Sequence, residues 1–349
     1  MLPKTRRVVT LDGAGRIAVA EEPVPELRPG TVLVEVRSCL VSPGTELGGV
    51  PARRKNPDPS RPPRPFGYGN AGVVLAAGEG CPGIEPGQRL ACMGGGYALH
   101  ASHALVPRNL TAPIPDGLSF DEAAFAHLAA TGLWAIRRGR PEFGQHAAVY
   151  GLGLVGQLAA QCARASGMHV VGLDRLALRR EVASRCGADL VLDPAAAKCE
   201  EAAGRFSRGH GFDLAILAFG GEATAALESA CRLMKLSPDG HRYGRIVVVG
   251  GARIAAELPT AFGNIDICAS SRPGPGYHDE AWEHGADYPA VLVEWTTRRN
   301  MEECLVFAAR RRLDFGSLVT HRFPLARAPE GCEELLARPE SALGVILNP

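Results

Sequence analysis

The sequence predicts an α/β protein that begins with a β-rich part and continues as a doubly wound parallel sheet. Three observations predict it. Short alternating or β-branched runs, separated by Gly and Pro, fill residues 1 to about 115, which is typical of strands. From about residue 145 onward, apolar strand-like runs alternate with helical patterns, which indicates a parallel sheet covered on both faces. A glycine-rich turn joins the first such strand to the helix that follows it.

In the β-rich part we expect strands at "RRVVTL", "RIAVAEE", "TVLVEVRS", "NAGVVLAAG" and "HASHALVP". The stretch "LVSPGTELGG", residues 40–49, follows the third of these runs and places Thr45 and Glu46 just after a Pro-Gly turn. Next comes "PARRKNPDPSRPPRPFGYG", a loop rich in Pro and Arg. It is either a solvated linker or a positively charged flap over a cleft.

A helix at "SFDEAAFAHLAATGLWAIRRG" opens the second part, because Ser119 and Glu122 have the spacing of a capping box. Helices are then expected at "LVGQLAAQCARASG", "LALRREVASRCG" and residues 222–234. The strands between and after them are "HAAVYG", "MHVVGLD", "ADLVLD", "FDLAILAF", "GRIVVVGG" and "DICASSR". After these strands the regular alternation ends, and the sequence shows a helix near "NMEECLVFAARRR" followed by the run "LVTHRFPL".

Composition limits the classes of function. A chain of 349 residues suggests two domains, and a net charge of +1 gives no general attraction to nucleic acid or to an anionic membrane. No run of about 18 apolar residues is present, and the N-terminus lacks the apolar segment of a signal peptide. Ten cysteines are scattered without any CxxC pair. We therefore expect a cytoplasmic protein with free, mostly buried thiols.

The segment "VYGLGLVGQLAAQ" carries Gly151, Gly153 and Gly156 between a strand and a helix. In a dinucleotide site the first glycine allows the tight turn, the second lets the backbone approach the pyrophosphate, and the third lets helix and strand pack closely. Asp174 ends the next strand, roughly 20 residues further on, where an acid can accept both ribose hydroxyls. This favours NAD over NADP, although the neighbouring Arg175 could turn toward a 2′-phosphate. The alternative is a structural glycine turn that binds no ligand.

Further residues are candidates for contact with the cofactor. They lie within the glycine motif or directly after later strands of the predicted sheet, and they are Leu154, Val155, Phe219, Gly250 and Gly251.

Nearly the whole chain resembles the medium-chain dehydrogenase/reductase superfamily. The segments "GQRLACMGGGYALHASHALVP", "IPDGLSFDEAAF" and "LDFGSLVTHRFPLARAPEGCEELL" look like its signatures. The resemblance implies a β-rich GroES-like catalytic domain over residues 1–126 and 274–349, and a Rossmann NAD-binding domain over residues 127–273. The segments "SPGTEL", "GYGNAGVV" and "RPGPGYHDEAWEHGADYP" further resemble a zinc-independent branch, with bacteriochlorophyllide-type dehydrogenases and the first half of certain bi-domain oxidoreductases.

Zinc-dependent members of the superfamily take ligands from three positions that can be followed in this sequence. A cysteine before the Gly-Thr/Ser-Asp turn corresponds to Pro43, and a histidine in a Gly-His-Glu motif corresponds to Tyr68. The third ligand falls on His127. One possible nitrogen ligand cannot hold a catalytic zinc, which needs three protein ligands. Only Cys92 lies where zinc-dependent members carry a lobe with four cysteines, and Cys39 lies within a strand run that indicates a core thiol.

The resemblance implies hydride transfer between nicotinamide and a carbonyl or alcohol. Without zinc, side chains must stabilise and protonate the developing alkoxide. Tyr68 could donate its phenolic proton, His127 could titrate near neutrality and relay a proton, and Thr45 matches a relay hydroxyl. Glu46 could orient a base or bind substrate. Each also has a structural interpretation, in which Tyr68 fills the volume left by zinc, His127 is a core histidine and Glu46 caps a turn.

Residues outside this group complete the assignment. By resemblance, Arg179 lies near the adenosine ribose. Arg272, Tyr277 and His278, in "SSRPGPGYHDE", follow the last Rossmann strand and are candidates for substrate contact. His100 and His103 lie in a strand run, and we expect structural roles for both.

The leading hypothesis is a zinc-independent, NAD(H)-dependent alcohol dehydrogenase or ketoreductase. Its substrate would be a small molecule such as a polyol, a sugar derivative or a biosynthetic intermediate. A metal-free reductase of quinones or activated double bonds is the alternative within enzymes, and a nucleotide-binding protein without turnover is the alternative of another class. We expect no nucleic-acid or membrane partner, and by analogy with the superfamily we expect a homodimer.

Overall fold

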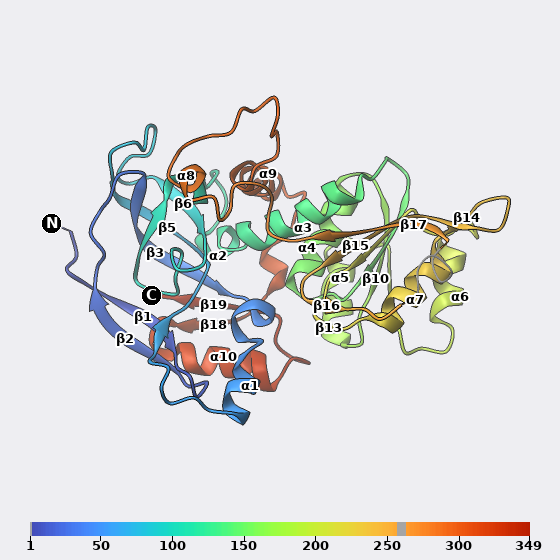
Figure 1. Ribbon diagram of the computed structural model, residues 1–349, viewed down its shortest axis with the longest axis horizontal. Coiled ribbons are helices and arrows are strands. Elements are labelled where there is room, and N and C mark those ends of the chain that lie inside the picture. The colour runs from blue at the N-terminus through green and yellow to red at the C-terminus, as the bar shows by residue number, and fades with distance from the viewer. Residues whose placement is uncertain (1, 257–262) are drawn as a thin grey trace. The chain divides into compact units, whose positions relative to one another are not determined.

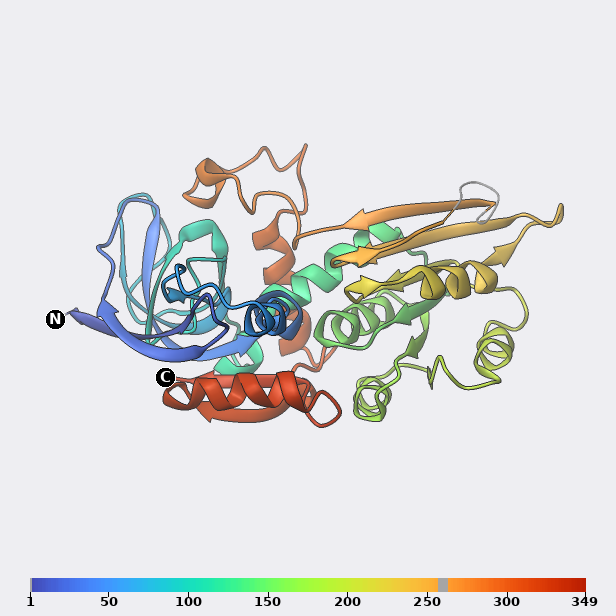
Figure 2. The ribbon, with the colours of Figure 1, turned by 60° about the horizontal axis from the view of Figure 1, so that its bottom comes forward.

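The computed structural model describes residues 2–256 and 263–349, which form two compact units (Figures 1 and 2). Unit 1 comprises the chain up to Ala130 together with Pro273–Arg311 and Leu318–Pro349, and unit 2 comprises Thr131–Arg272 and Arg312–Ser317. The first boundary differs from the expected 126/127 because a single helix, α3 (Ala126–Gly139), continues across it. The division therefore places His127 in unit 1.

Unit 1 is built on two sheets. A three-stranded sheet has the order β2–β1–β4, with β1 at Thr5–Leu11, β2 at Ile17–Pro23 and β4 at Arg64–Pro65. A larger sheet has the order β18–β19–β3–β5–β6–β8, and β7 pairs with β3 beside this path. Its strands are β3 (Thr31–Val41), β5 (Gly69–Ala77), β6 (Arg89–Met93), β7 (His103–Pro107), β8 (Thr111–Pro113), β18 (Val319–Pro324) and β19 (Gly344–Asn348).

The C-terminal segment belongs to unit 1 because β19 completes its sheet. Val345 of β19 pairs antiparallel with Val41 of β3, so the red end of the chain lies beside a blue strand in Figure 1. The helices that lie wholly in unit 1 are α1 (Val50–Lys55), α2 (Phe120–Ala123), α8 (Glu280–Glu283), α9 (Thr297–Ala309) and α10 (Ala328–Ala337). Its 3₁₀ turns lie at Arg108–Leu110 and Leu325–Arg327, and a third, Gly316–Leu318, spans the boundary with unit 2.

The expected capping box is confirmed at the start of α2. The Ser119 hydroxyl accepts from the backbone N–H of Glu122, and the Glu122 carboxylate accepts from the backbone N–H of Ser119. The single helix expected over residues 119–139 is wrong in detail, because α2 ends at Ala123 and α3 starts at Ala126.

The first part of the Pro- and Arg-rich stretch after β3 is held against unit 1. Residues Val50–Lys55 form α1, where Arg53 donates to the carbonyl oxygen of Asp12 at 3.1 Å. Arg54 donates to the carbonyl oxygen of Gly15 at 3.2 Å and also pairs with Glu333. These contacts tie two of its arginines to other parts of unit 1, which argues against their serving as mobile charges for a ligand.

Unit 2 contains a sheet whose parallel strands have the order β11–β10–β9–β12–β15, with β17 pairing β15 in parallel and β14 pairing it antiparallel. The chain runs outward from β9 in both directions, so the β9–β12 boundary is the switch point at which doubly wound sheets bind ligands. The strands are β9 (His146–Tyr150), β10 (His169–Leu173), β11 (Leu190–Leu192), β12 (Leu214–Leu217), β14 (Lys235–Leu236), β15 (Arg242–Val249) and β17 (Asn264–Ser270). A second, two-stranded sheet is formed by β13 (Gly221–Glu222) and β16 (Ala252–Arg253). The helices of unit 2 include α4 (Leu154–Ala165), α5 (Ala177–Arg185), α6 (Cys199–Phe206) and α7 (Thr224–Leu233).

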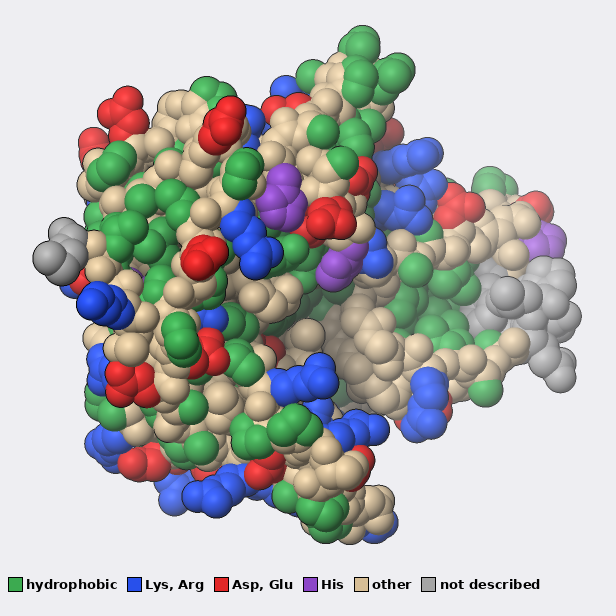
Figure 3. Space-filling model, turned by 60° about the vertical axis from the view of Figure 1, so that its left-hand side comes forward, with side chains coloured by type: hydrophobic (Ala, Val, Ile, Leu, Met, Phe, Trp, Pro, Cys, Tyr) green, Lys and Arg blue, Asp and Glu red, His purple; other side chains and the backbone are tan. Residues whose placement is uncertain are grey.

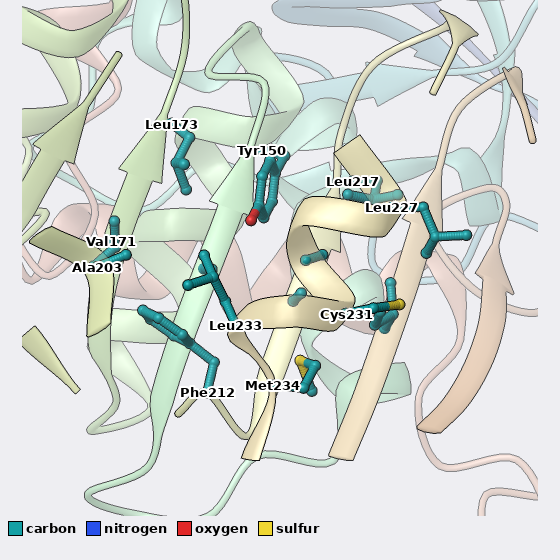
Figure 4. Packing of buried hydrophobic residues seen from close by; sticks show 14 of the residues in the cluster. Tyr150, Val171, Leu173, Ala203, Phe212, Leu217, Leu227, Cys231, Leu233 and Met234 are labelled. Atoms are coloured by element: carbon teal, nitrogen blue, oxygen red, sulfur yellow. The ribbon is translucent and has the colours of Figure 1, made fainter. Parts of the chain in front are cut away.

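The core of unit 2 explains why its strands read as apolar runs. Tyr150, Leu173 and Leu217, from three neighbouring strands, pack with Leu227 and Leu233 of α7 (Figure 4). Burial of each such side chain stabilises the fold by about 1.5–3 kcal/mol. This packing holds the ends of β9 and β12 in fixed positions, and those ends carry the candidate cofactor residues.

The face drawn in Figure 3 carries charges of both signs. In Figure 3, acidic and basic side chains are interspersed with apolar ones on the face in view, as the net charge of +1 suggests. None of the helices in the described ranges has both the length and the hydropathy that a bilayer span requires.

Candidate functional site

The glycine turn of unit 2 has the geometry of a phosphate-binding turn. Gly151 has a φ of +84°, which disfavours any residue with a side chain. A Cβ on Gly156 would lie 1.8 Å from the carbonyl oxygen of Gly151, so only glycine allows this approach of α4 to β9. Gly153 is the N-cap of α4 and no side chain caps it, which leaves the first helical amides available to an anion. These residues fit the pyrophosphate of a dinucleotide.

Asp174 follows β10 and is 7% exposed. Its Oδ2 accepts from the backbone N–H of Leu152 at 2.7 Å, and its Oδ1 accepts from the N–H of Leu176 at 2.8 Å. A carboxylate oxygen has two lone-pair directions, so Oδ1 can still accept a ribose hydroxyl, whereas the second direction of Oδ2 is taken by Arg179. Arg179 Nη1 lies 3.5 Å from Oδ2, and a Cβ on Gly153 would lie 4.0 Å from the same nitrogen. Arg179 therefore lies between Asp174 and the glycine turn.

The remaining cofactor candidates gather at the same edge of the sheet. Phe219 follows β12, and its ring would lie 3.0 Å from a Cβ on Gly151. Gly250, with a φ of +95°, and Gly251 follow β15, the strand next to β12. Leu154 and Val155 are the first two residues of α4. The fold thus brings these separate segments together around the β9–β12 switch point.

In unit 1, Tyr68 lies directly before β5 and its ring meets that of His127 edge-on, with the centroids 4.5 Å apart. Burial and the charge of Glu46 raise the pKa of Tyr68 to about 12, although hydrogen bonds with Ser42 and Thr45 act in the opposite direction. The phenol is therefore protonated near neutral pH and can donate a hydrogen bond.

His127 is buried on α3. Its Nδ1 lies 3.1 Å from the carbonyl oxygen of Ala124, which can only accept, so Nδ1 carries the proton. Burial lowers the pKa of His127 to about 3. The expectation that His127 titrates near neutrality therefore does not hold. Burial disfavours the charged form of the ring, and the positive charge of His100 disfavours it further. A Cβ on Gly69 would lie 2.1 Å from His127 Cε1, so the ring packs directly against the glycine after Tyr68.

The turn that follows β3 is a short π-helical turn at Pro43–Leu47, a form frequent at functional sites. Thr45 on this turn is exposed, whereas the side chain of Glu46 is 4% exposed. Glu46 Oε2 accepts from the backbone N–H of Ser42 at 2.7 Å, and Oε1 lies 2.9 Å from Nε2 of the fully buried His100. Burial would lower the pKa of His100, but Glu46 and the thiol of Cys39 raise it to about 10.

The Tyr68 cluster consists of Tyr68 and the residues around it, namely Ser42, Thr45, Glu46, His100 and His127. Sequence reasoning missed Ser42 and the pairing of Glu46 with His100. Ser42 directly precedes Pro43 and Gly44, and its position beside this Pro-Gly turn is a signal that the sequence offers. The pairing of Glu46 with His100 had none, because the two lie on separate segments and no local pattern connects them.

The candidate substrate residues are divided between the units, since Arg272 belongs to unit 2 while Tyr277 and His278 belong to unit 1. The Tyr277 hydroxyl accepts from the backbone N–H of Gly95 at 2.8 Å, and its ring stacks on His278 at 3.8 Å. Tyr277 is close enough to Tyr68 to raise its pKa, so it belongs to the same cluster. His103 lies in β7, with Nδ1 3.1 Å from the Ser102 hydroxyl.

The donor set of unit 1 does not fit a catalytic zinc. Of the three positions that the resemblance implies, Pro43 offers no ligand and Tyr68 is held protonated, which leaves His127. Across residues 2–256 and 263–349, no group of three or more His, Cys, Asp or Glu side chains has an arrangement that could hold a metal ion. Zinc needs at least three such donors.

Comparisons with known proteins agree with this fold. A zinc-binding dehydrogenase family model matches residues 155–284. The chain is 28% identical over 208 residues to an alcohol dehydrogenase of Geobacillus stearothermophilus, covering 51% of this chain and 60% of that protein. It is 26% identical over 356 residues to the sorbitol dehydrogenase of Mus musculus, covering 93% and 91%. The solved structure of alcohol dehydrogenase TADH from Thermus sp. ATN1 superposes with a TM-score of 0.79 at 23% identity, covering 98% of this chain and 99% of that one.

Proposed function

The chain belongs to the medium-chain dehydrogenase/reductase superfamily and is an oxidoreductase, and from this premise we propose that it works without zinc. In this proposal it uses NAD(H) to transfer hydride between the nicotinamide and the carbonyl or alcohol group of a small molecule. The substrate class is a polyol, a sugar derivative or a biosynthetic intermediate. The sorbitol and alcohol dehydrogenases among its relatives support this choice of substrate class.

One observation carries the proposal, namely the protonated phenol of Tyr68 where zinc-dependent relatives place a histidine ligand. Burial keeps its pKa near 12, and Ser42 and Thr45 surround its oxygen with hydroxyl groups. A developing alkoxide needs a hydrogen-bond donor that then gives up its proton, and an alcohol is a weaker acid than this phenol. Tyr68 is thus the proposed acid in carbonyl reduction.

The neighbouring groups have proposed supporting roles. Thr45 is exposed and hydrogen-bonds with Tyr68, so it can return a proton from solvent to the phenol. His127, neutral and packed edge-on against Tyr68, would orient the phenol and not supply the proton. Tyr277 and His278 are retained as substrate contacts because Tyr277 lies in the Tyr68 cluster.

For the cofactor we propose NAD(H) in preference to NADP(H), bound by unit 2. NAD(H) would supply or accept the hydride. Gly151, Gly153 and Gly156 would hold the pyrophosphate, and Asp174 would accept the ribose hydroxyls and repel a 2′-phosphate. Arg179 would hold phosphate or ribose oxygens, since it lies beside both features.

We further propose a cytoplasmic homodimer with neither nucleic-acid nor membrane partners. The cysteines of the described residues are all free thiols, which suits a reducing compartment. The outer strand β17 is largely exposed, and Ile267 within it is 37% exposed, which suits pairing with a second copy.

The decisive experiment is a panel of ketoses, hydroxyketones, enones and quinones, with NADH consumption as the readout and no added metal. We expect a hydroxyketone or sugar-type carbonyl to be reduced. Tyr68→Phe should reduce turnover by about 10²–10⁴-fold while NADH binding is unchanged. Tyr243→Phe, the same change at a 43% exposed site in unit 2, is the matched control and should keep full activity.

Other outcomes select the alternatives. Reduction of enones or quinones alone, at a rate that Tyr68→Phe does not change, would favour double-bond or quinone reduction. NADH binding without turnover of any compound would favour a nucleotide-binding protein that lacks catalysis. About one zinc per chain, together with loss of activity to a chelator, would overturn the zinc-independent mechanism.

A further inference from the structure

We propose that His100 is a positioning residue for the Tyr68 cluster, because its buried ring pairs with Glu46 and thereby holds Ser42 and the Pro43–Leu47 turn that follows it (residues 42–47) in place against Tyr68. The catalytic consequence rests on the proposed function. The physical arrangement does not, and it can be measured without a substrate.

The ring of His100 has a fixed position that does not depend on the turn. The backbone N–H of His100 donates to the carbonyl oxygen of Phe66 at 3.1 Å, and its own carbonyl oxygen accepts from Val9 at 2.9 Å. The Phe66 ring meets the imidazole edge-on, with centroids 5.3 Å apart. His100 is completely buried, so this framework presents a preset imidazole to Glu46.

Glu46 uses its two carboxylate oxygens on different partners. Oε2 accepts from the N–H of Ser42, which closes the turn on itself, and the backbone N–H of Glu46 also donates to the carbonyl oxygen of Ser42 at 3.0 Å. Oε1 faces His100 Nε2 at 2.9 Å. Through this second oxygen the turn is connected to the segment that contains His100.

Charge makes this connection stronger than an ordinary polar contact. A carboxylate with 4% exposure would be strongly disfavoured without a partner, and the facing cation offsets part of that cost, so removal of either partner leaves an uncompensated buried charge. The other titratable groups that act on His100 or respond to it are the Cys39 thiol and neutral His127, and neither supplies a competing negative charge as close as Glu46.

The arrangement matters for Tyr68 because the hydroxyl groups of Ser42 and Thr45, which hydrogen-bond with the phenol, both lie in residues 42–47. If Glu46 lost its partner, the turn could shift and the phenol would lose its aligned neighbours. A misplacement of about 1 Å near the reacting atoms can cost about 10²-fold in rate.

The first test is spectroscopic and uses the whole chain labelled with ¹⁵N-histidine. At about pH 8 an ordinary histidine is neutral, so we expect one imidazolium signal, absent in His100→Gln and converted to a neutral ring in Glu46→Gln. Hydrogen exchange at the Glu46 amide should become at least about tenfold faster in His100→Gln. The matched control, His103→Gln, changes a half-buried histidine of β7 and should leave both signals as they are. Absence of the imidazolium, or unchanged exchange, would overturn the proposal.

The second test measures turnover of a carbonyl compound identified with the panel above. His100→Gln should lower kcat by about 10²-fold and leave the NADH dissociation constant within about twofold. The double variant Glu46→Gln/His100→Gln removes the buried unpaired charge and should recover stability but not kcat. If kcat recovers together with stability, the pair is only structural and the proposal fails. If the wild type reduces no carbonyl, the proposed function fails while the spectroscopic test still decides on His100.

Discussion

The packing of His127 against Gly69 predicts that Gly69→Ala destabilises unit 1. An alanine Cβ at this site would lie 2.1 Å from Cε1 and 2.2 Å from Nδ1 of the imidazole, where contacts below 3.0 Å essentially never occur. The ring would have to move by about 1 Å. Overpacking of this kind costs about 1–3 kcal/mol, and loss of the hydrogen bond to Ala124 adds about 1 kcal/mol. We therefore expect a loss of about 2–4 kcal/mol in the free energy of unfolding.

Denaturant unfolding of the apoprotein, followed by circular dichroism and tryptophan fluorescence, measures this loss. Two units can unfold in separate transitions, so NADH affinity is recorded in parallel as a probe of unit 2. Gly49→Ala is the matched control, because Gly49 has a φ of −87° and nothing lies within 4 Å of a Cβ there. It should change stability by no more than about 0.5 kcal/mol.

A double-mutant cycle makes the test specific to the histidine. In a His127→Ala background the obstructing ring is gone, so Gly69→Ala should then cost less than about 1 kcal/mol. An equal cost in both backgrounds, or a cost below about 0.5 kcal/mol in the wild type, would show that the imidazole does not lie over Gly69. The interpretation of His127 as a neutral ring that orients Tyr68 would then be wrong.

Three further predictions concern the cofactor, acid stability and metal content. Asp174→Ala should weaken NADH binding more than NADPH binding in fluorescence titrations, and equal losses would remove Asp174 from the selection of cofactor. Because the pKa of His127 is lowered to about 3 in the folded state, the unfolded chain binds the extra proton first as pH falls below about 6.5. Wild-type stability should thus fall from pH 6.5 toward 4 more steeply than that of His127→Gln in denaturant titrations. Elemental analysis of purified protein should find far less than one zinc per chain, and dialysis against a chelator should leave the NADH-dependent activity unchanged.

The features that could be predicted from sequence are those encoded within a short stretch of chain. The turn at Gly151–Gly156 needs a positive φ at Gly151 and a close approach of the helix at Gly156. Only glycine meets both requirements, so the sequence shows glycines at a fixed spacing. The Ser119–Glu122 capping box is likewise local, since both hydrogen bonds join residues three apart. The interruption between α2 and α3 has no comparable signal, because the apolar spacing continues through it.

The properties of the unit 1 cluster depend instead on burial and on contacts between distant segments. A histidine exposed to water titrates near neutrality, and the same residue on α3 is neutral down to about pH 3 because of what covers it. His100, a strand histidine by its pattern, gains a positive charge because the fold places Glu46 at 2.9 Å from it and the Cys39 thiol within hydrogen-bonding reach. Sequence identifies the residue types, but their charge states follow from the tertiary structure.

These charge states together limit the chemistry that unit 1 can support. The negative charge of Glu46 is matched by His100, Tyr68 is protonated and His127 is neutral, so the cluster has no surplus negative charge with which to attract a divalent cation. In the proposed function, the same balance leaves the phenolic proton of Tyr68 to respond to negative charge on a substrate oxygen. Such a site is suited to stabilise and protonate an alkoxide as it forms, and poorly suited to remove a proton from an alcohol near neutral pH. On this reasoning carbonyl reduction is the favoured direction, and alcohol oxidation should become competitive only as the pH approaches the raised pKa of Tyr68.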